Sequence, residues 1–475
     1  MVEQNLKDKT VKGVIWSSVE RFSVQGVQFL VMLVIARILD PKDFGLVGML
    51  AIFIAVAQIL IDSGFYQALI RKQDRTEKDN CTVFYFNIVT SLLIYLILYS
   101  VAPYVAMFYG EPDLISLMRV LCVIVIINSL TVVQRAIYTA SLNFKIQAKA
   151  SLIAAFISGA VGIYMAYNDY GVWALVWQQL INAGVNALVL WLHSSWYPKW
   201  LYSWNSFYPL FFYGSKLLAS GLLETVYSNM YTLVIGKVFS ASSLGFYTQA
   251  DRFTRIPSSS ISTVLSKVIF PVLSNVQNED ARLRNIYRKL LRVSVFVVFP
   301  VMCCLAGISY PLVALTIGEK WRFAASLIIP LCFSGMWYPV QALNLDLLQV
   351  KGRSDLFLKL EVIKKAFGIL FLTISVQYGI VFMCYGSIVM SIFSLIINTY
   401  YTGKLINVGF FLQMKDIIGT LLASMVMFVF VFLITKTLRD NILQLSVGIL
   451  VGAATYFSIV YIFRFKELSY LKSLR

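Results

Sequence analysis

The chain has 475 residues, of which 59% are apolar and only 13% are charged. Soluble globular proteins carry about 25% charged residues, so this composition excludes a water-soluble enzyme, a secreted disulfide scaffold and a disordered chain. Lys and Arg outnumber Asp and Glu by 40 to 23, which gives a net charge of +17. The composition instead indicates a polytopic membrane protein. In such a protein, the positions of the surplus Lys and Arg residues relative to the bilayer must be known before their charge can indicate a binding partner.

Residue usage also argues against several chemistries. The single histidine leaves no His-based metal site, and no G-x-x-x-x-G-K-[ST] motif is present to bind a nucleotide. The six cysteines show no C-x-x-C spacing and are interpreted as buried, reduced thiols. The first apolar run is too long for the core of a signal peptide, so no cleavage is expected. We expect no catalytic residue, no metal and no cofactor.

The fold class predicted from the apolar runs is an all-α polytopic membrane protein with about fourteen transmembrane helices. A helix needs about 20 mostly apolar residues to cross the hydrocarbon core. The candidate segments are 14–36, 45–70, 82–106, 114–139, 149–167, 171–192, 208–238, 244–274, 291–310, 323–349, 356–376, 379–402, 414–435 and 442–463.

Most basic residues outside these segments fall on one face of the membrane. With the N-terminus inside, the basic clusters at 71–78 and 282–292 both lie on the cytoplasmic side, and the outer connections carry few Lys or Arg. The positive-inside rule then predicts a multi-pass protein of the cytoplasmic (inner) membrane with both termini in the cytoplasm. The basic residues left within the segments are Arg21, Arg119, Arg135, Lys216, Arg252, Arg255, Lys267, Lys364 and Lys365.

The sequence repeats itself after about 200 residues. The run 33–39, followed by Gly45, matches the run 233–239, followed by Gly245, and a Gly-Glu pair precedes both the fourth and the tenth segment. Repeats separated by six spans have the same orientation, which predicts two pseudo-symmetric lobes with a site at their interface. The predicted division is 1–192 for the N-lobe, 193–207 for an amphipathic linker, 208–402 for the C-lobe, and 403–475 for two further helices and a cytoplasmic tail. Trp and Tyr recur in the linker, which predicts a short helix in the membrane interface.

Polar side chains recur at helical spacing in segments 1, 2, 4, 7, 8 and 10. An ionisable residue at membrane depth costs at least about 2.5–3.5 kcal/mol and normally faces an interior or a wet cavity. Residues three or four apart share one helical face, so these segments are expected to surround a hydrated, cationic cavity. The candidate substrate-binding residues are Arg21, Gln25, Gln28, Lys216, Arg252, Arg255, Lys267, Arg135, Gln341 and Asn344, and the candidates for ion coupling are Asp62, Glu224 and Asp251. Structural ion pairs, such as Asp251 with Arg255, are the alternative interpretation for single residues.

Arginine clusters bind phosphate bidentately, so the cavity favours an anionic cargo. Each negative charge moved outward gains about 2.3 kcal/mol per 100 mV of membrane potential. A diphosphate could therefore be exported on the potential alone, or with coupling to H⁺ or Na⁺, and without ATP.

Three stretches of the chain resemble a known family: 36–45, 62–65 and 171–176. Three later ones do so too: 235–237, 244–247 and 270–277. The sequence resembles the polysaccharide transporter branch of the MOP (multidrug/oligosaccharidyl-lipid/polysaccharide) superfamily, of the WzxC and TuaB type. The resemblance implies two six-helix lobes in a V shape plus two C-terminal helices. It also implies flipping of an undecaprenyl diphosphate-linked oligosaccharide, such as an O-antigen, capsule or exopolysaccharide unit, from the inner to the outer leaflet by alternating access.

The same resemblance implies partners and site roles. Related flippases use arginines of helices 1 and 8 on the pyrophosphate, and Arg21 and Arg252 or Arg255 stand at comparable places. The expected partners are the lipid-linked oligosaccharide, membrane lipids and polysaccharide polymerase or assembly proteins, with no nucleic acid. Two alternatives remain open: a MATE-type cation-coupled multidrug antiporter, and a membrane glycosyltransferase or polymerase.

Overall fold

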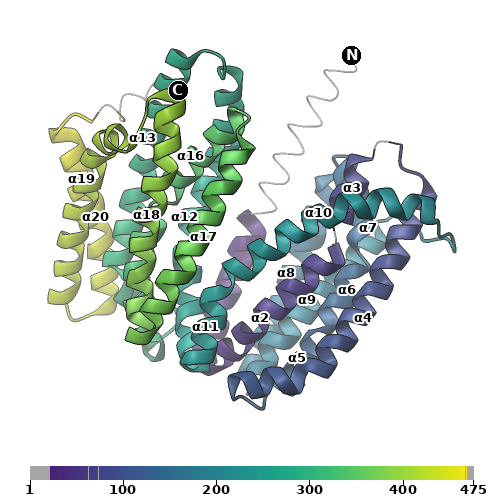
Figure 1. Ribbon diagram of the computed structural model, residues 1–475. Coiled ribbons are helices and arrows are strands. Elements are labelled where there is room, and N and C mark those ends of the chain that lie inside the picture. Colours follow the sequence, from purple (N-terminus) through teal and green to yellow (C-terminus); the bar gives the residue numbers. More distant parts are fainter. Residues whose placement is uncertain (1–21, 63, 73, 466, 468–475) are drawn as a thin grey trace. The chain divides into compact units, whose positions relative to one another are not determined.

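The computed structural model describes residues 22–62, 64–72, 74–465 and 467, with the backbone alone for 260, 261 and 263–268. Throughout this part of the chain the regular secondary structure is helical, as Figure 1 shows. The chain divides into two compact units, one up to Gly245 and one from Phe246 onward. An all-helical polytopic fold was the sequence prediction, and it is confirmed.

The first unit holds twelve helical segments, coloured purple to teal in Figure 1. They are a helix over Phe22–Ile38, α2 (Pro41–Asp62), α3 (Phe65–Arg71), α4 (Glu77–Tyr109), α5 (Leu114–Leu121), α6 (Val123–Ser129), α7 (Val132–Ala140), α8 (Phe144–Tyr167), α9 (Val172–Leu192), α10 (Trp204–Ser228), α11 (Met230–Val238) and the first turn of α12 (Ala241–Asn275). The helices α8 and α9 pack along each other as a hairpin.

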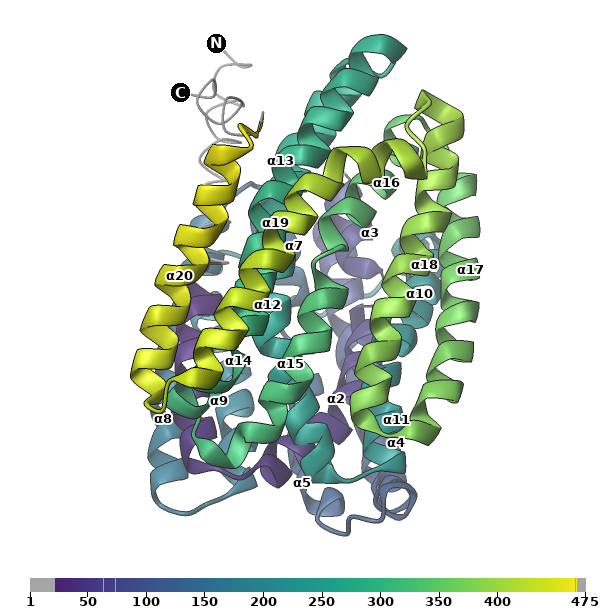
Figure 2. The ribbon, with the colours of Figure 1, turned by 90° about the vertical axis from the view of Figure 1, so that its left-hand side faces the viewer.

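The second unit continues from α12 to the C-terminal helices. They are α13 (Asp280–Gly307), α14 (Ser309–Thr316), η1 (Glu319–Trp321), α15 (Arg322–Gly335), α16 (Tyr338–Val350), α17 (Ser354–Ser375), η2 (Val376–Tyr378), α18 (Ile380–Ile406), α19 (Phe410–Thr437) and α20 (Asn441–Ile462). The yellow helices α19 and α20 form a hairpin beside α13, which Figure 2 shows from the side. The units divide inside α12, so α10 and α11 group with the first unit, whereas the predicted C-lobe begins at residue 208. The lobe division therefore stays a prediction.

Within the described residues, every predicted segment lies mostly in helix, but fewer helices are long and apolar enough to cross a membrane. Among the described residues, nine helical stretches are long and apolar enough to cross a membrane, or ten if the bent pair 114–129 and 132–140 is one span. The helices α10, α12 and α17 are not among these stretches. The count of about fourteen spans stays a prediction.

Several of the predicted polar segments are broken in the middle. The second segment breaks at Gly64, whose φ of 70° ends α2. The fourth is divided into α5, α6 and α7, the seventh breaks at Asn229, and the tenth breaks between Gly335 and Tyr338. The continuous helices α8, α9, α18, α19 and α20 correspond to segments in which no polar row was identified. Breaks free backbone carbonyls, which are tolerated at membrane depth only beside protein or water. Four of the six polar segments are broken, whereas α12, which holds the polar row of the eighth segment, is continuous.

The predicted interfacial helix in the linker is wrong. No helix is formed by residues 194–203, and α10 begins only at Trp204. Pro198 lacks an amide hydrogen and disfavours helix at the residue before it. The linker backbone instead donates to side chains of α4, from Ser203 N to Thr82 Oγ1 at 3.1 Å.

Side-chain contacts also hold this linker on α4. The Lys199 ammonium lies 2.7 Å from Glu77, and this hydrogen bond raises the pKa of Lys199 above its usual value. The ring of Trp200 stacks on Tyr85 with 5.4 Å between centroids. The linker is therefore a fixed extended segment rather than a helix.

Candidate functional site

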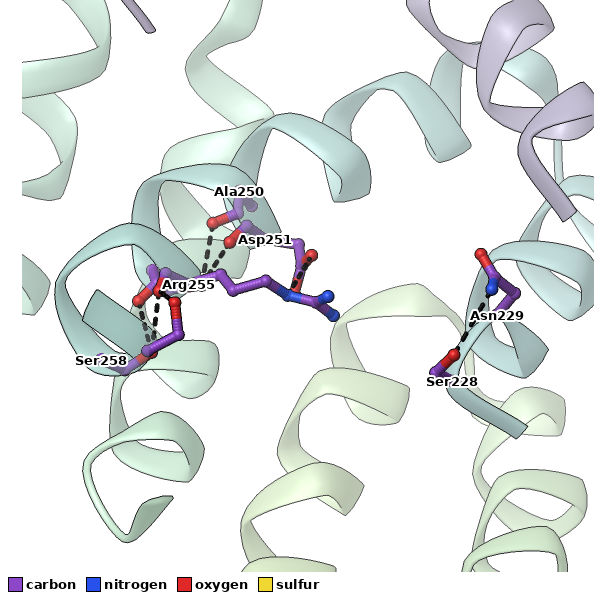
Figure 3. A network of polar contacts seen from close by, with 8 residues as sticks. Ser228, Asn229, Ala250, Asp251, Arg255 and Ser258 are labelled. Carbon is purple, nitrogen blue, oxygen red and sulfur yellow. Dashed lines mark hydrogen bonds and ion pairs between the residues drawn. The ribbon is translucent and has the colours of Figure 1, made fainter. Parts of the chain in front are cut away.

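The cationic face of α12 is built around Asp251 and Arg255, one turn apart. The Arg255 Nε lies 3.2 Å from a carboxylate oxygen of Asp251, and the two side chains are 65% and 29% exposed. Figure 3 shows the terminal nitrogens of Arg255 directed away from the helix. Arg252 is exposed three residues earlier and lies on the same face. Within the described residues, neither guanidinium forms another hydrogen bond, so Asp251 orients Arg255 while its terminal nitrogens stay accessible.

A second polar row on α12, at positions 254, 258 and 262, packs into the unit. Thr254, Ser258 and Ser262 are all buried. Their hydroxyls donate to backbone carbonyls four residues earlier, at 3.1, 2.9 and 2.6 Å. Hydroxyls satisfied in this way let a helix bury polar residues without a partner helix. The serine-rich pattern is therefore mainly internal to α12, and the arginines are the groups it presents outward.

A second polar row lies inside the first unit, around Asp62. Gln58 donates to Asp62 at 3.3 Å and accepts from the Asn128 amide at 2.8 Å. Arg135 is exposed, lies near enough to Asp62 for a favourable charge interaction, and donates to Asn186 Oδ1 at 3.0 Å. The structure therefore brings together the predicted residues Asp62 and Arg135, from segments 2 and 4.

The remaining predicted residues of the first unit are more scattered. Lys216 and Glu224 are both exposed on α10, and the Lys216 ammonium lies 4.9 Å above the ring of Phe212. Gln25 is half-buried and Gln28 exposed on the helix over Phe22–Ile38. Arg21 and the side chain of Lys267 lie outside the described residues.

Gln341 and Asn344 lie on α16, where their amides bond within the second unit. Asn344 is fully buried and exchanges two hydrogen bonds with Gln413 of α19, at 3.1 and 3.0 Å. Thr402 of α18 also donates to Asn344, at 2.6 Å. Gln341 donates to the Ser391 carbonyl of α18. These amides fasten helices to one another, and we place neither in the proposed binding surface.

Two polar groups were missed by the sequence analysis. Asn186 bonds Ser151 across the α8–α9 hairpin, and Asn182 bonds Ser158. Asn182 and Asn186 are four residues apart on α9, and Ser151 and Ser158 are seven apart on α8. Both spacings put the two residues on one helical face, so the sequence alone could have indicated this group. A second group joins α13 to α19, where Arg288 and Arg292 both bind the carboxylate of Asp416.

The described residues contain no group of three or more His, Cys, Asp or Glu side chains that could hold a metal ion. The polar side chains of the candidate site carry guanidinium, amide and carboxylate groups. An accessible guanidinium group can bind an anion through two parallel hydrogen bonds.

The helical fold of this chain matches that of a solved membrane flippase. The solved structure of the lipid II flippase MurJ in an inward closed conformation matches 97% of this chain and 100% of that chain, with a TM-score of 0.76 at 14% identity. At this identity the likeness shows the fold alone.

A family model described as a polysaccharide biosynthesis protein matches residues 34–326. The chain therefore belongs to this family, within the MOP superfamily, and is a transport protein rather than an enzyme. The teichuronic acid biosynthesis protein TuaB of Bacillus subtilis is 24% identical over 74% of this chain and 73% of its own length. The lipopolysaccharide biosynthesis protein WzxC of Escherichia coli is 25% identical over 76% and 74%. The family resemblance stated from the sequence is confirmed.

Proposed function

We propose that the protein flips an undecaprenyl diphosphate-linked oligosaccharide from the inner to the outer leaflet of the cytoplasmic membrane. The printed names of TuaB and WzxC place those relatives in teichuronic acid and lipopolysaccharide biosynthesis. The family resemblance implies a cargo linked to a lipid with an anionic diphosphate headgroup. Membership in the family supports the cargo class, and the residues of α12 support the headgroup contact.

The observation that carries the proposal is the accessible guanidinium pair of α12. Asp251 binds Arg255 through Nε, so the two terminal nitrogens remain for an anion, and Arg252 adds a second cation on the same face. A guanidinium binds phosphate oxygens through two parallel hydrogen bonds. Asp251 acts here as a positioning group, and a role in proton or Na⁺ coupling stays open for Asp62, Glu224 and Asp251.

The transport mechanism completes the proposal. Two repeats with the same orientation, about fourteen spans and cytoplasmic termini form the predicted framework for alternating access in a V-shaped fold. The membrane potential favours outward movement of a diphosphate by about 2.3 kcal/mol per charge per 100 mV. Arg21, Gln25, Gln28, Lys216, Lys267 and Arg135 belong to the proposed cationic surface as further contacts.

Export in a bacterium that lacks its own flippase tests the cargo contact. We expect Arg255→Ala to reduce surface glycan about tenfold or more, because a charged hydrogen bond contributes about 1.5–3 kcal/mol. Arg282→Ala is a matched control, since Arg282 pairs with Glu279 on its own helix end and is 63% exposed. Undiminished export by the Arg255→Ala protein at equal membrane abundance would remove α12 from the site.

The two alternative functions, a multidrug antiporter and a glycosyltransferase or polymerase, are less consistent with the charge of α12 and with the family of the chain. A multidrug antiporter of the MATE type needs anionic or aromatic groups where cationic cargo binds, whereas the outward face of α12 is cationic. A glycosyltransferase or polymerase is an enzyme, and the family of this chain is one of transport proteins.

A further inference from the structure

The helices α2 and α12 begin at matching positions 200 residues apart, each directly after a two-residue break that ends the preceding helix. At the start of α2, the Asp40 amide donates to the Asp43 carboxylate at 3.1 Å. At the start of α12 the bond between the matching positions has the opposite direction, because the Ser243 amide donates to the Ser240 hydroxyl, at 3.1 Å. The sequence repeat is therefore also a repeat of local structure, with positions 40 and 43 matching 240 and 243.

These two helix starts cross with their backbones in contact. A methyl group added at Gly45 would overlap the carbonyl oxygen of Ala241 and lie 3.0 Å from its Cα. A methyl group added at Gly245 would overlap the carbonyl oxygen of Pro41 and lie 3.2 Å from its Cα. Each glycine thus packs on the first residue of the other helix, and the two contacts are reciprocal, as a two-fold relation between the repeats requires.

The crossing is buried and leaves no room for a side chain. Phe44, Leu244 and Ala241 around it are at most 5% exposed. Because the clashing atoms belong to the backbone, no rotamer change relieves them, and any side chain larger than hydrogen must separate the helices. The crossing lies within the first compact unit, where the chain is about to enter the second.

Both helices run without a break from the crossing to the candidate functional groups. On α2 the helix continues to Gln58 and Asp62, and on α12 it continues to Asp251 and Arg255. At 1.5 Å per residue, Arg255 lies about 15 Å along α12 from the crossing. Each group of polar residues therefore lies on a helix that starts at the crossing.

The predicted topology puts this crossing at the outer end of both helices. The connections that precede Pro41 and Ala241 lie outside by the distribution of basic residues. Two backbones in contact leave no passage for a glycan between these helix ends, so an outward release needs them to separate.

We propose that Gly45 and Gly245 are positioning residues that form a latch at the outer ends of α2 and α12, which closes by backbone contact and parts once in each transport cycle. The link to transport rests on the proposed function, whereas the contact itself does not. The two are therefore tested by separate measurements.

The first measurement follows the contact without any cargo. In the purified full-length protein with Ala241→Cys as reporter, we expect slow reaction with a water-soluble maleimide because Ala241 is 2% exposed. Adding Gly45→Ala or Gly245→Ala should speed labelling about tenfold. Gly184→Ala is the matched control, because that helical glycine has open space around it. Labelling that is equally slow in all three variants would overturn the latch, whether or not the protein transports glycan.

The second measurement tests the cycle and leaves both glycines in place. Lys42→Cys and Ser242→Cys follow the two contact residues directly, and a short bis-maleimide would join them while the latch is closed. The joined protein should lose export, and each single variant carrying the same reagent on one thiol should keep it. Continued export by the joined protein would show that the crossing does not part, which overturns the proposed cycle step while leaving the cargo assignment intact.

Discussion

The second unit holds two groups of arginine and aspartate that have the same chemistry and opposite surroundings. On α12, Arg255 is 65% exposed and its partner Asp251 is 29% exposed. Between α13 and α19, Arg288 and Arg292 are 26% and 22% exposed, and their shared partner Asp416 is 1% exposed. In the first group a carboxylate on the same helix orients an accessible guanidinium. In the second, a buried carboxylate binds two arginines across a helix interface.

The difference in exposure indicates a different role for each group of arginine and aspartate. The donors of Arg288 are used on Asp416, with its Nε at 2.6 Å and one terminal nitrogen at 2.8 Å. Removing either side of a buried ion pair is strongly destabilising, because the other charge is left buried without a partner. The group between α13 and α19 is therefore structural, and the group on α12 is available to a ligand. We expect changes to the group between α13 and α19 to lower stability, and changes to the group on α12 to lower transport.

The largest effect is expected from Asp416→Ala. This change leaves two half-buried arginines without their carboxylate, which costs about 3–5 kcal/mol in comparable buried pairs. We expect a much lower unfolding temperature in detergent and little protein in the membrane. Asp251→Ala is the comparison, because Asp251 is exposed enough for water to replace it. Equal unfolding temperatures of the two variants would show that the aspartates of the two groups contribute equally to stability, which contradicts the roles given to them.

The next largest effect is expected from Asn344→Ala. It removes two hydrogen bonds from Gln413 and one from Thr402 in a buried site, and a buried polar atom left without a partner costs about 1–3 kcal/mol. Thermal unfolding of the purified protein measures this loss. Gln349→Ala serves as the control, since Gln349 is exposed on the same helix. If Asn344→Ala instead abolished export with unchanged unfolding, Asn344 would return to the binding surface.

A smaller effect is expected from Arg255→Lys. The charge remains but the planar fork is lost, so one of two parallel hydrogen bonds to phosphate disappears, about a tenfold loss in export rate. The rate of glycan appearance at the cell surface measures it, with unfolding temperature as the check on folding. Full activity would show that Arg255 acts only as a point charge.

The smallest effect is expected from Arg282→Ala, which removes an exposed pair with Glu279. Exposed ion pairs contribute below about 1 kcal/mol. Unfolding temperature and export should both stay near the values of the parent protein. A large loss in either would mean that exposure is a poor guide to the role of an arginine in this chain.

The sequence predicted the positions of the helices well because apolar length is a local property. It also located the 200-residue repeat, whose matching helix starts recur in the structure. The break at Asn229 had no signal, since neither Gly nor Pro stands there. The prediction of a linker helix was wrong because aromatic spacing indicates only a membrane interface. The backbone conformation of the linker depends on Pro198 and on hydrogen bonds to α4.

The candidate site was harder to predict, because helical spacing gives a face but not what that face meets. Arg252 and Arg255 are spaced by three, and so are Gln341 and Asn344. The first two are exposed, while Asn344 is enclosed by α18 and α19. Arg288 and Arg292 were counted with the cytoplasmic surface charge, and their partner Asp416 lies more than 120 residues away. Pairings at such separations depend on tertiary packing.

Binding of the lipid headgroup to the purified protein tests the central claim most directly. The affinity for undecaprenyl diphosphate is compared with that for the uncharged alcohol of the same chain, in the parent protein and in Arg252→Ala and Arg255→Ala variants. We predict that the parent protein prefers the diphosphate by about tenfold or more and that each substitution narrows this preference. Equal affinity of the parent protein for both lipids would contradict the account.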